Sequence, residues 1–514
     1  MLKKIIKLDT HNFVHLIGIS GIAFGIPVSK AIMSISMVLL FINLLLEGNY
    51  HSYWDNLKKN KLNHLVLSFI LLKIFSVTWS SNLNYAIHDL KITLPLLLIM
   101  TCLTIKPIII KKHLHLVLTL FISSTTLASL INFVFYVNLI GDIEYSDIRD
   151  MSIFSSHIRF GLSISFSVAI LLYFLSYLKR NRIIICSLIA WLIFYTYYSQ
   201  VISGYLTLFA VLLIHIIHKA WKINRRIVGP VLTIFIGLIT VFSLSIFTPI
   251  TINKNDYEDL PKKTSNGNYY TNNFSEISPI TKKPIYILVC ETELKNEWPK
   301  YSNIDFDFTD KKGQPIKSTI IRYLSSKDYP KDSLGLSMLK TEDLKSIENG
   351  ETNYIKNGIM ARIYNIKYQL YNNKDPNNHS LLQRLEYWKC GLKILSKNYV
   401  LGVGIGDVED TFKTYYKKTN TLLSAKNQHR AHNMYLTIFI SLGLLGILIF
   451  IFIHIFFFNL MLKKKNILGV FFVIIILISF TIEDTLETQA GITFYSLFTG
   501  LLSTNETKKK KIEN

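Results

Sequence analysis

The sequence predicts an all-α polytopic membrane protein with about twelve transmembrane helices and one large periplasmic loop domain of mixed α/β structure between spans nine and ten. Half of its 514 residues are hydrophobic and only 18% are charged, whereas soluble chains carry about a quarter charged residues. The apolar residues gather in runs long enough to cross a bilayer, which takes roughly 20 residues. A polar segment, residues 248–432, interrupts these runs. This composition argues against disordered, fibrous and disulfide-rich classes.

Twelve apolar runs are candidate spans, and the second, fourth and seventh are short for that role. No small-residue cleavage site follows the first run, so we expect no cleavable signal peptide. The runs lie near residues 12–28, 31–46, 62–79, 90–105, 113–139, 158–178, 183–198, 201–218, 227–247, 434–460, 466–481 and 487–503.

Lysine and arginine in short loops predict the orientation of the spans, because these residues are retained in the cytoplasm. With both termini inside, the inner segments hold 23 Lys and Arg, and the short outer loops hold four: Lys30, Lys91, Arg149 and Arg159. This bias accounts for much of the formal net charge of +22. The charge therefore reflects membrane topology, and we expect no nucleic-acid partner.

These patterns divide the chain into spans one to nine (1–247), a periplasmic loop (248–432), spans ten to twelve (433–503) and a basic cytoplasmic tail (504–514). In the loop, residues 285–290 and 304–308 are strand candidates. Residues 333–372 are expected to form helices broken at Asn349-Gly350 and Asn357-Gly358. Cys290 and Cys390 share this loop and could pair in an oxidising compartment.

Two arginines near the predicted outer face are candidate phosphate ligands. Arg159 enters span six; it could snorkel to lipid head groups, but a guanidinium is also the best bidentate clamp for phosphate. Arg384 begins a predicted helix whose apolar face holds Leu385, Trp388, Leu392 and Leu395. That helix could equally lie on the membrane surface with a solvated arginine. The Gly402, Gly404 and Gly406 that follow could bring N–H groups to a phosphate or form a plain turn.

A histidine and three acids lie near the same face. His432 stands where the polar loop enters span ten and could act as a base or as a capping residue. Glu483, Asp484 and Glu487 lie in the turn before span twelve, where they could be solvated, orient cations or act as base. Arginines, a histidine and carboxylates from remote segments suit a membrane-borne substrate with two phosphates. We find no motif for a metal site.

Several motifs resemble the bacterial O-antigen ligase and polymerase superfamily. His432-Asn433-Met434-Tyr435-Leu436, followed by Gly443-Leu444-Leu445-Gly446, is similar to its His-Asn-x-x-Leu…Gly-x-x-Gly pattern. The segment from Arg384 to Trp388 with Leu401–Gly406 resembles the motif that closes the family's outer loop, and residues 340–344, 361–364, 379–384 and 483–491 resemble the Bacteroidetes-type branch. The family's Ser-Arg-x-Gly element is altered: Ile202 stands where the arginine is expected.

The resemblance implies a metal-independent, inverting glycosyltransferase of the bacterial inner membrane with its active face in the periplasm and no cofactor. Its donor would be glycan on undecaprenyl pyrophosphate, and its acceptor lipid A-core. His432 would be the base, with Glu483 or Glu487 as the alternative, and Arg159 and Arg384 would bind pyrophosphate. Asn433, Trp388 and Gly404 would support them.

Three alternatives remain at this point. An O-antigen polymerase of the same superfamily would use another lipid-linked glycan as acceptor. A transporter of lipid-linked oligosaccharide would usually show two related halves and polar midplane groups, but the halves differ and Lys73 is the one clear charge within a span. A non-catalytic sensing protein would carry a cytoplasmic effector domain, which we do not find.

Overall fold

A computed structural model describes residues 9–140, 148–178, 181–355, 358–372, 375–377 and 379–504. Most of the predicted basic tail and some of the lysines and arginines used for orientation (Lys3, Lys4, Lys7, Lys179 and Arg180) lie outside these residues. The chain forms two compact units, which we describe separately. The first comprises Met1–Ile143, Arg149–Asn224 and Arg384–Asn514, and the second comprises Glu144–Ile148 and Arg225–Gln383.

The first unit is a helical bundle, and eleven of the twelve predicted apolar runs each coincide with one of its helices. Its helices are α2 (Thr10–Val28), α3 (Lys30–Glu47), α4 (Tyr50–Lys59), α5 (Lys61–Ser76), α6 (Leu83–Ile105), α7 (Pro107–Tyr136), α8 (His157–Leu175), α9 (Arg182–Ser199), α10 (Ile202–Ile223), α17 (Ser380–Asn398, whose first turn falls in the second unit), α18 (Val408–Lys418), α19 (Met434–Lys463), α20 (Ile467–Ile482) and α21 (Gln489–Thr504). The ninth predicted run is α11 (Arg225–Phe247), which belongs to the second unit.

Ten of the described helices are long and apolar enough to cross a membrane, so the chain is a multi-pass membrane protein. They correspond to the first ten predicted spans. The last two, α20 and α21, have 16 residues each. At 1.5 Å per residue such a helix rises about 24 Å, which is less than the ~30 Å hydrocarbon core. Twelve full-length spans therefore stay a prediction.

Small residues bring α8 and α10 into close contact. A Cβ added to Gly161 would lie 3.3 Å from the Cα of Gly204. Further along both helices, the hydroxyls of Ser165 and Thr207 are 2.8 Å apart. Because both contacts advance in the same sense, α8 and α10 run parallel and begin at the same end of the bundle. Such small-residue contacts are typical of membrane helix packing, where backbones must approach closely.

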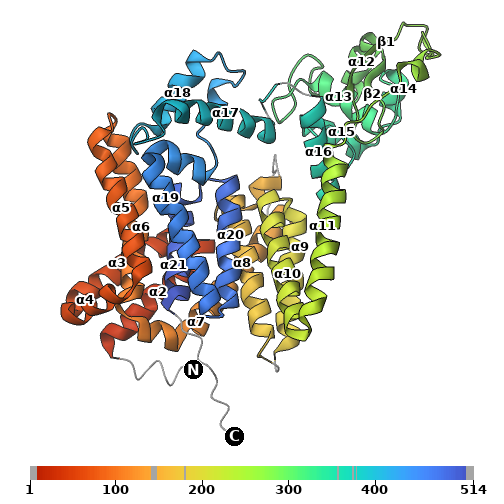
Figure 1. The fold of residues 1–514 in the computed structure, drawn as a ribbon. Helices are drawn as coiled ribbons and strands as arrows, with labels where there is room; N and C mark the ends of the chain where they lie inside the picture. The colour runs from red at the N-terminus through yellow and green to blue at the C-terminus, as the bar shows by residue number, and fades with distance from the viewer. Residues whose placement is uncertain are drawn as a thin grey trace. The chain divides into compact units, whose positions relative to one another are not determined.

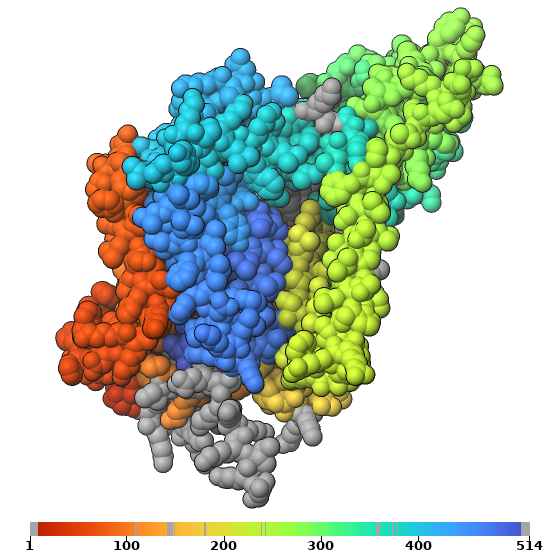
Figure 2. Space-filling view, in the orientation of Figure 1, coloured from red at the N-terminus to blue at the C-terminus, as the bar shows by residue number. Residues whose placement is uncertain are grey.

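Helices α17, from Arg384 onward, and α18 lie across the end of the bundle at which α19 begins (Figure 1). The space-filling view shows the cyan and light blue surface of these helices covering the blue upper end of α19 (Figure 2). A buried cluster built from Tyr387, Ile394, Phe412 and Ile440 joins them to α19. The predicted loop 248–432 is thus shared between the units, because its last part packs on the bundle.

The second unit combines α11 with a small mixed α/β structure. Strands β1 (Thr271–Ile277) and β2 (Pro284–Val289) form an antiparallel two-stranded sheet. The buried Trp298 and Leu324 belong to its core. Its other α-helices are α12 (Glu291–Glu297), α13 (Ile316–Ser326), α14 (Ser333–Ser337), α15 (Thr341–Glu348) and α16 (Gly358–Tyr371).

The structure confirms one of the two predicted strands in this unit. Residues 285–290 coincide with β2, whereas residues 304–308 form bends and turns. There the indole of Trp298 donates to the carbonyl of Ile304 at 2.8 Å, and Phe308 N–H donates to the carbonyl of Asp305 at 3.0 Å. These bonds satisfy the backbone locally, so the alternating pattern does not give a strand. Cys290 and Cys390 are both free cysteines.

Candidate functional site

A cleft of about 290 Å³ at the α17–α18 end of the first unit brings together four of the eight predicted site residues. It draws on α8, α18, the segment before α19 and the turn between α20 and α21, which are remote in sequence. These four residues are Arg159, His432, Glu483 and Glu487. The full lining is Arg159, Glu409, Phe412, Gln428, His429, Arg430, His432, Glu483, Asp484, Glu487 and Thr488.

The start of α19 fixes His432 at the edge of this cleft. Asn433 is the N-cap: its side-chain oxygen accepts from the N–H of Leu436 at 3.0 Å, and its amide donates to the carbonyl of Thr481 at 3.2 Å. The Trp388 indole fixes the residues before His432, because it donates to the carbonyl of Ala431 at 3.0 Å. His432 itself has a φ of 46°. Asn433 and Trp388 therefore support His432 through the backbone.

His432 and Glu483 form a hydrogen-bonded pair, with 3.0 Å between Nδ1 and the carboxylate. Since a carboxylate can only accept, it fixes the proton on Nδ1 and leaves Nε2 as the basic nitrogen. Burial alone would raise the pKa of Glu483. The hydrogen bond from His432 and the nearby positive charges of Arg159 and Arg384 outweigh that effect, and the pKa lies below its usual value. Glu483 is thus held as a carboxylate.

The other two acids of the turn have different partners. Glu487 accepts from Nη1 of Arg430 at 3.1 Å. Burial tends to raise the pKa of Glu487, but the charges of Lys73 and Arg430 outweigh burial and hold that pKa below its usual value. Asp484 accepts from the hydroxyl of Thr437 at 2.7 Å, and burial raises its pKa. The three acids are therefore buried and bonded to the protein, which rules out the alternative that they are simply solvated.

The two predicted arginines approach the His432–Glu483 pair from different helices. Arg159 lies in the first turn of α8 and lines the cleft, and its Nε is buried without a hydrogen-bond partner among the described residues. Arg384 does not line the cleft, but it lies close enough for its charge to act on Glu483. The cleft thus has a cationic wall next to a histidine–carboxylate pair.

The Arg384 helix packs on the bundle through a face other than the predicted apolar face as a whole. Leu385 and Leu392 are exposed, whereas Tyr387, Gly391 and Ile394 are buried. Gly391 lets the helix approach α19 closely, because a Cβ there would lie 2.8 Å from the side chain of Leu436. The helix therefore packs on α19 through its glycine, with Leu385 and Leu392 turned outward.

The glycine-rich loop after this helix is a clasp between backbone segments. Val403 N–H donates to the carbonyl of Ile440 at 2.8 Å and Gly404 N–H to that of Ser441 at 2.9 Å. Gly404 has a φ of +85°, and a Cβ there would overlap the hydroxyl of Ser80. Gly406 N–H donates to that hydroxyl at 3.1 Å. These N–H groups already have protein acceptors, so the loop does not offer them to a phosphate.

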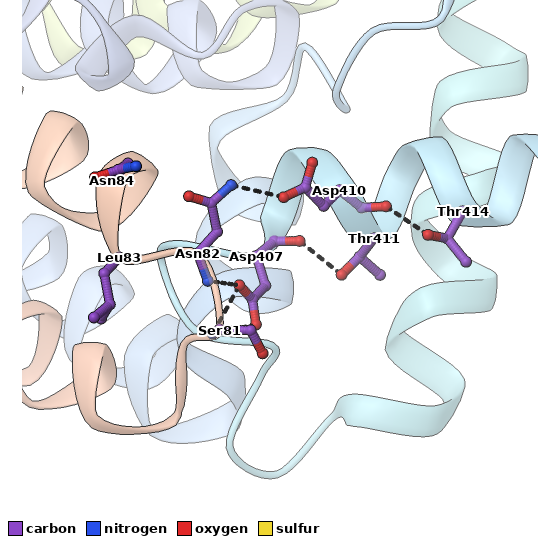
Figure 3. Close-up of a pocket in the computed structure, with 8 residues that line it drawn as sticks. All are labelled: Ser81, Asn82, Leu83, Asn84, Asp407, Asp410, Thr411 and Thr414. Carbon is purple, nitrogen blue, oxygen red and sulfur yellow. Dashed lines mark hydrogen bonds between the residues drawn. The ribbon is translucent and has the colours of Figure 1, made fainter.

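Asp407, the next residue, completes the clasp (Figure 3). Its carboxylate accepts from the N–H groups of Ser81 and Asn82 at 2.8 to 2.9 Å, in the turn before α6. The amide of Asn82 donates to Asp410 at 2.8 Å (Figure 3). The hollow drawn there, of about 680 Å³, lies beside these bonds. Gly404 and Asp407 therefore attach the loop between α17 and α18 to α19 and to the α5–α6 turn.

Sequence reasoning missed Arg430 and Asp89. Arg430 carries a charge two residues before His432 and lines the cleft. Asp89 lies within α6, because that helix begins at Leu83, earlier than the predicted span. Its carboxylate is 2.8 Å from Nζ of Lys73 in α5, so the charge within span three has a partner. The signal that could have revealed this pair is a positive charge within span three and a negative charge directly before span four.

Residues 343–451 match the family model described as O-antigen ligase. This segment of the chain is therefore similar to the O-antigen ligase family. The match includes Arg384, Trp388, Gly404, His432 and Asn433, so the predicted resemblance is confirmed on these motifs. A search of curated proteins found no match to the chain.

The cleft combines residues from inside and outside the matched segment. Arg159, Glu483 and Glu487 lie outside residues 343–451 but line the same cleft as His432. Among the described residues, no three His, Cys, Asp or Glu side chains are grouped so that they could hold a metal ion. The positive charge in the cleft is supplied by guanidinium groups.

Proposed function

We propose that this protein is a glycosyltransferase that moves glycan from undecaprenyl pyrophosphate to a sugar hydroxyl of lipid A-core, that is, an O-antigen ligase. The observation that carries the proposal is the hydrogen bond between His432 and Glu483 in a cleft that Arg159 also lines. This arrangement offers a base and an anion-binding wall side by side, which transfer from a pyrophosphate-linked donor requires.

In the proposed reaction, Nε2 of His432 accepts the proton of the acceptor hydroxyl, while Glu483 stabilises the imidazolium that forms. The hydroxyl oxygen attacks the anomeric carbon of the donor sugar. The bond from that carbon to the phosphate oxygen breaks, and the pyrophosphate leaves with the electron pair. Arg159 and Arg384 stabilise its developing charge. Attack opposite the leaving group inverts the anomeric centre, and no metal or other cofactor takes part.

Glu483 and Glu487 are less suited to be the base than His432. Glu487 is engaged with Arg430 and is only 7% exposed at its side chain, whereas that of His432 is 34% exposed. The pKa of each glutamate lies below its usual value, which makes it a weak base. We therefore assign Glu483 to orienting His432, and Glu487 to holding Arg430.

Packing of α8 on α10 supports the assignment of Arg159 as the substitute for the arginine that is missing at Ile202. Gly161 and Gly204 are in contact, and the two helices run parallel. Arg159 and Ile202 each stand two residues before their glycine, so they lie at the same level of the bundle. A guanidinium lost from α10 can thus be replaced from α8.

We place the protein in the bacterial inner membrane, with the cleft on the periplasmic side and both termini in the cytoplasm. The excess of lysine and arginine in alternate loops supports this orientation. The donor and acceptor are both lipid-anchored, so a cleft at the end of the bundle is within their reach. The phospholipid bilayer then surrounds the spans and holds the lipid anchors of both substrates.

An O-antigen polymerase is the second candidate, because it uses the same donor chemistry and differs in its acceptor. Deletion of the gene, followed by gel analysis of lipopolysaccharide, separates the two. A ligase deletion removes all long glycan from lipid A and accumulates lipid-linked polymer. A polymerase deletion leaves a single repeat on lipid A. Normal lipopolysaccharide would contradict both.

A further inference from the structure

A chain of buried charged side chains runs from the interior of the bundle to the cleft. Lys73 in α5 lies 2.8 Å from the carboxylate of Asp89 in α6 and donates to the hydroxyl of Thr93 at 3.0 Å. Asp89 and Glu487 lie close enough for each carboxyl group to act electrostatically on the other. Glu487 in turn accepts from Arg430 at the cleft. The contacts therefore connect a charge pair within two spans to one guanidinium at the candidate site.

Burial makes this chain costly for a purely structural element. Lys73 and Asp89 are each 4% exposed, and taking ions out of water costs several kcal/mol each even when they are paired. Apolar side chains of similar size would often stabilise the same place better. The chain also contains two adjacent carboxyl groups, whose repulsion is relieved by Lys73 on one side and Arg430 on the other. The alternation of positive and negative groups along this chain would hold the side chain of Arg430 in place.

Arg430 is placed to contact a ligand in the cleft. Its side chain is 23% exposed and lines the cleft, whereas that of Glu487 beneath it is 7% exposed. Glu487 is bonded to Nη1 alone, and a guanidinium has five N–H donors. Since the remaining donors outnumber those used by Glu487, the fork of Arg430 can serve a second anion.

We propose that Arg430 is a further pyrophosphate-binding residue of the cleft, and that Lys73 and Asp89 are positioning residues that hold its guanidinium there through Glu487. The proposal rests on the proposed function, since it takes the ligand to be a lipid pyrophosphate. It adds a cationic group that neither the family motifs nor the spacing of the predicted clusters identified.

Binding of undecaprenyl pyrophosphate to the full-length protein in nanodiscs tests the role of Arg430. Loss of a charged hydrogen bond costs about 1.5–3 kcal/mol, so Arg430→Ala should weaken binding about 10- to 100-fold. Arg430→Lys should recover part of it, because a point charge replaces part of the fork. Arg182→Ala, which removes an exposed arginine at the start of α9, should bind like the wild type. Equal binding by Arg430→Ala and wild type would overturn the proposal.

A double-mutant cycle tests the positioning role of Asp89. Asp89→Asn alone should weaken binding, yet it should have no further effect in an Arg430→Ala background, because its action passes through that residue. A merely structural role would give the same loss in both backgrounds and would overturn this part. If Asp89→Asn does not fold, the double variant Lys73→Met/Asp89→Leu replaces both charges by apolar groups. It should fold and still bind more weakly, and unchanged binding would overturn the positioning role.

The same assay separates failure of this proposal from failure of the proposed function. Undecaprenol, which lacks the pyrophosphate, should bind far more weakly to the wild type than undecaprenyl pyrophosphate does. If the wild-type protein does not distinguish these lipids, both the proposed function and the inference fail. If the wild type distinguishes them and Arg430→Ala does so equally well, only the inference fails.

Discussion

His432 is held in a backbone conformation that histidine seldom adopts. Its φ of 46° lies in the left-handed region, which costs a non-glycine residue on the order of 1–3 kcal/mol. The hydrogen bonds of Asn433 and Trp388 on either side maintain that conformation. Strain at a residue that also pairs with a buried carboxylate is typical of functional sites. The conformation aims Nδ1 at Glu483, and Nε2 is the nitrogen that the proposed mechanism uses as the base.

Replacing His432 by asparagine should abolish transfer without loss of protein. Asparagine tolerates the left-handed conformation better than most residues, so His432→Asn should melt at or above the wild-type temperature in detergent. Loss of a general base should lower the transfer rate about 100- to 10,000-fold. The control is His51→Asn, which removes an exposed histidine in α4. Near-normal transfer by His432→Asn would refute the assignment of the base.

Arg384 should not tolerate lysine if it clamps a phosphate. A lysine keeps the charge but cannot reproduce the planar fork, so Arg384→Lys should lose at least about tenfold in transfer, as expected for a charged hydrogen bond. The same exchange at Arg159 tests whether that residue substitutes for Ile202. Transfer rates of the purified variants, compared with Lys389→Arg in the same helix, provide the measurement. Full activity of both lysine variants would show that bulk charge is enough.

At the scale of single residues, the sequence indicated chemistry but not partners. His432, Glu483 and Arg159 were recognisable because ionisable groups at span ends are scarce. The pairing of Glu483 with His432 and of Glu487 with Arg430 could not be predicted, because it depends on how two remote segments meet. Asp89 was overlooked because its helix begins earlier than the apolar run.

Among the elements, α19 is distinguished by a break at Gly443, which has a φ of +65° and a ψ of −159°. This region of backbone conformation is essentially open to glycine alone. The break exposes the carbonyls of Ile440 and Ser441, which accept from Val403 and Gly404 of the clasp. The second half of the family motif is thus explained by geometry: its first glycine lets the loop before α18 dock on a span.

Gly443→Ala should therefore destabilise the protein by about 2 kcal/mol or more, from strain of 1–3 kcal/mol and from overlap with the carbonyl of Val400. The thermal melting temperature in detergent should fall by several degrees. Gly229→Ala in α11 is the matched control, since a Cβ there meets nothing within 4 Å. Alanine should be neutral or favourable at that helical position. Equal melting of both variants would contradict the role of the break.

The sequence predicts a helix correctly wherever a long apolar run forms it. All twelve apolar runs coincide with helices, because a run of that length has few other stable structures in lipid. The alternating pattern failed where local hydrogen bonds compete, as at residues 304–308, and the apolar pattern of the Arg384 helix did not show that the helix packs on α19 at Gly391. Periodicity alone carries neither kind of information.

At the scale of the whole molecule, the charge bias predicts the side on which each loop lies. A reporter that is active only outside the cytoplasm should be active when fused after Asn296, in the second unit, and inactive after Lys222 or Lys464. The alternation of lysine and arginine between successive loops is the physical reason. The reverse pattern of activity would contradict the orientation and move the cleft to the cytoplasmic side.

The division into two units was not visible in the sequence. Hydropathy placed one boundary at residue 248 and the other at 432, whereas residues from Arg384 onward pack with the bundle and α11 packs with the second unit. Hydropathy reports which residues avoid water, but the units are defined by which side chains contact each other. The clasp of Gly404 and Asp407 is the feature that attaches this part of the polar segment to the spans.

We propose that the cleft transfers glycan from a lipid pyrophosphate with His432 as base. The most direct measurement follows release of undecaprenyl pyrophosphate from a glycan-bearing donor by the purified protein, with lipid A-core as acceptor and EDTA present. We predict release that requires the acceptor, survives EDTA and disappears in His432→Asn. Release that continues in His432→Asn, or movement of intact donor across the bilayer without release of undecaprenyl pyrophosphate, would contradict the account.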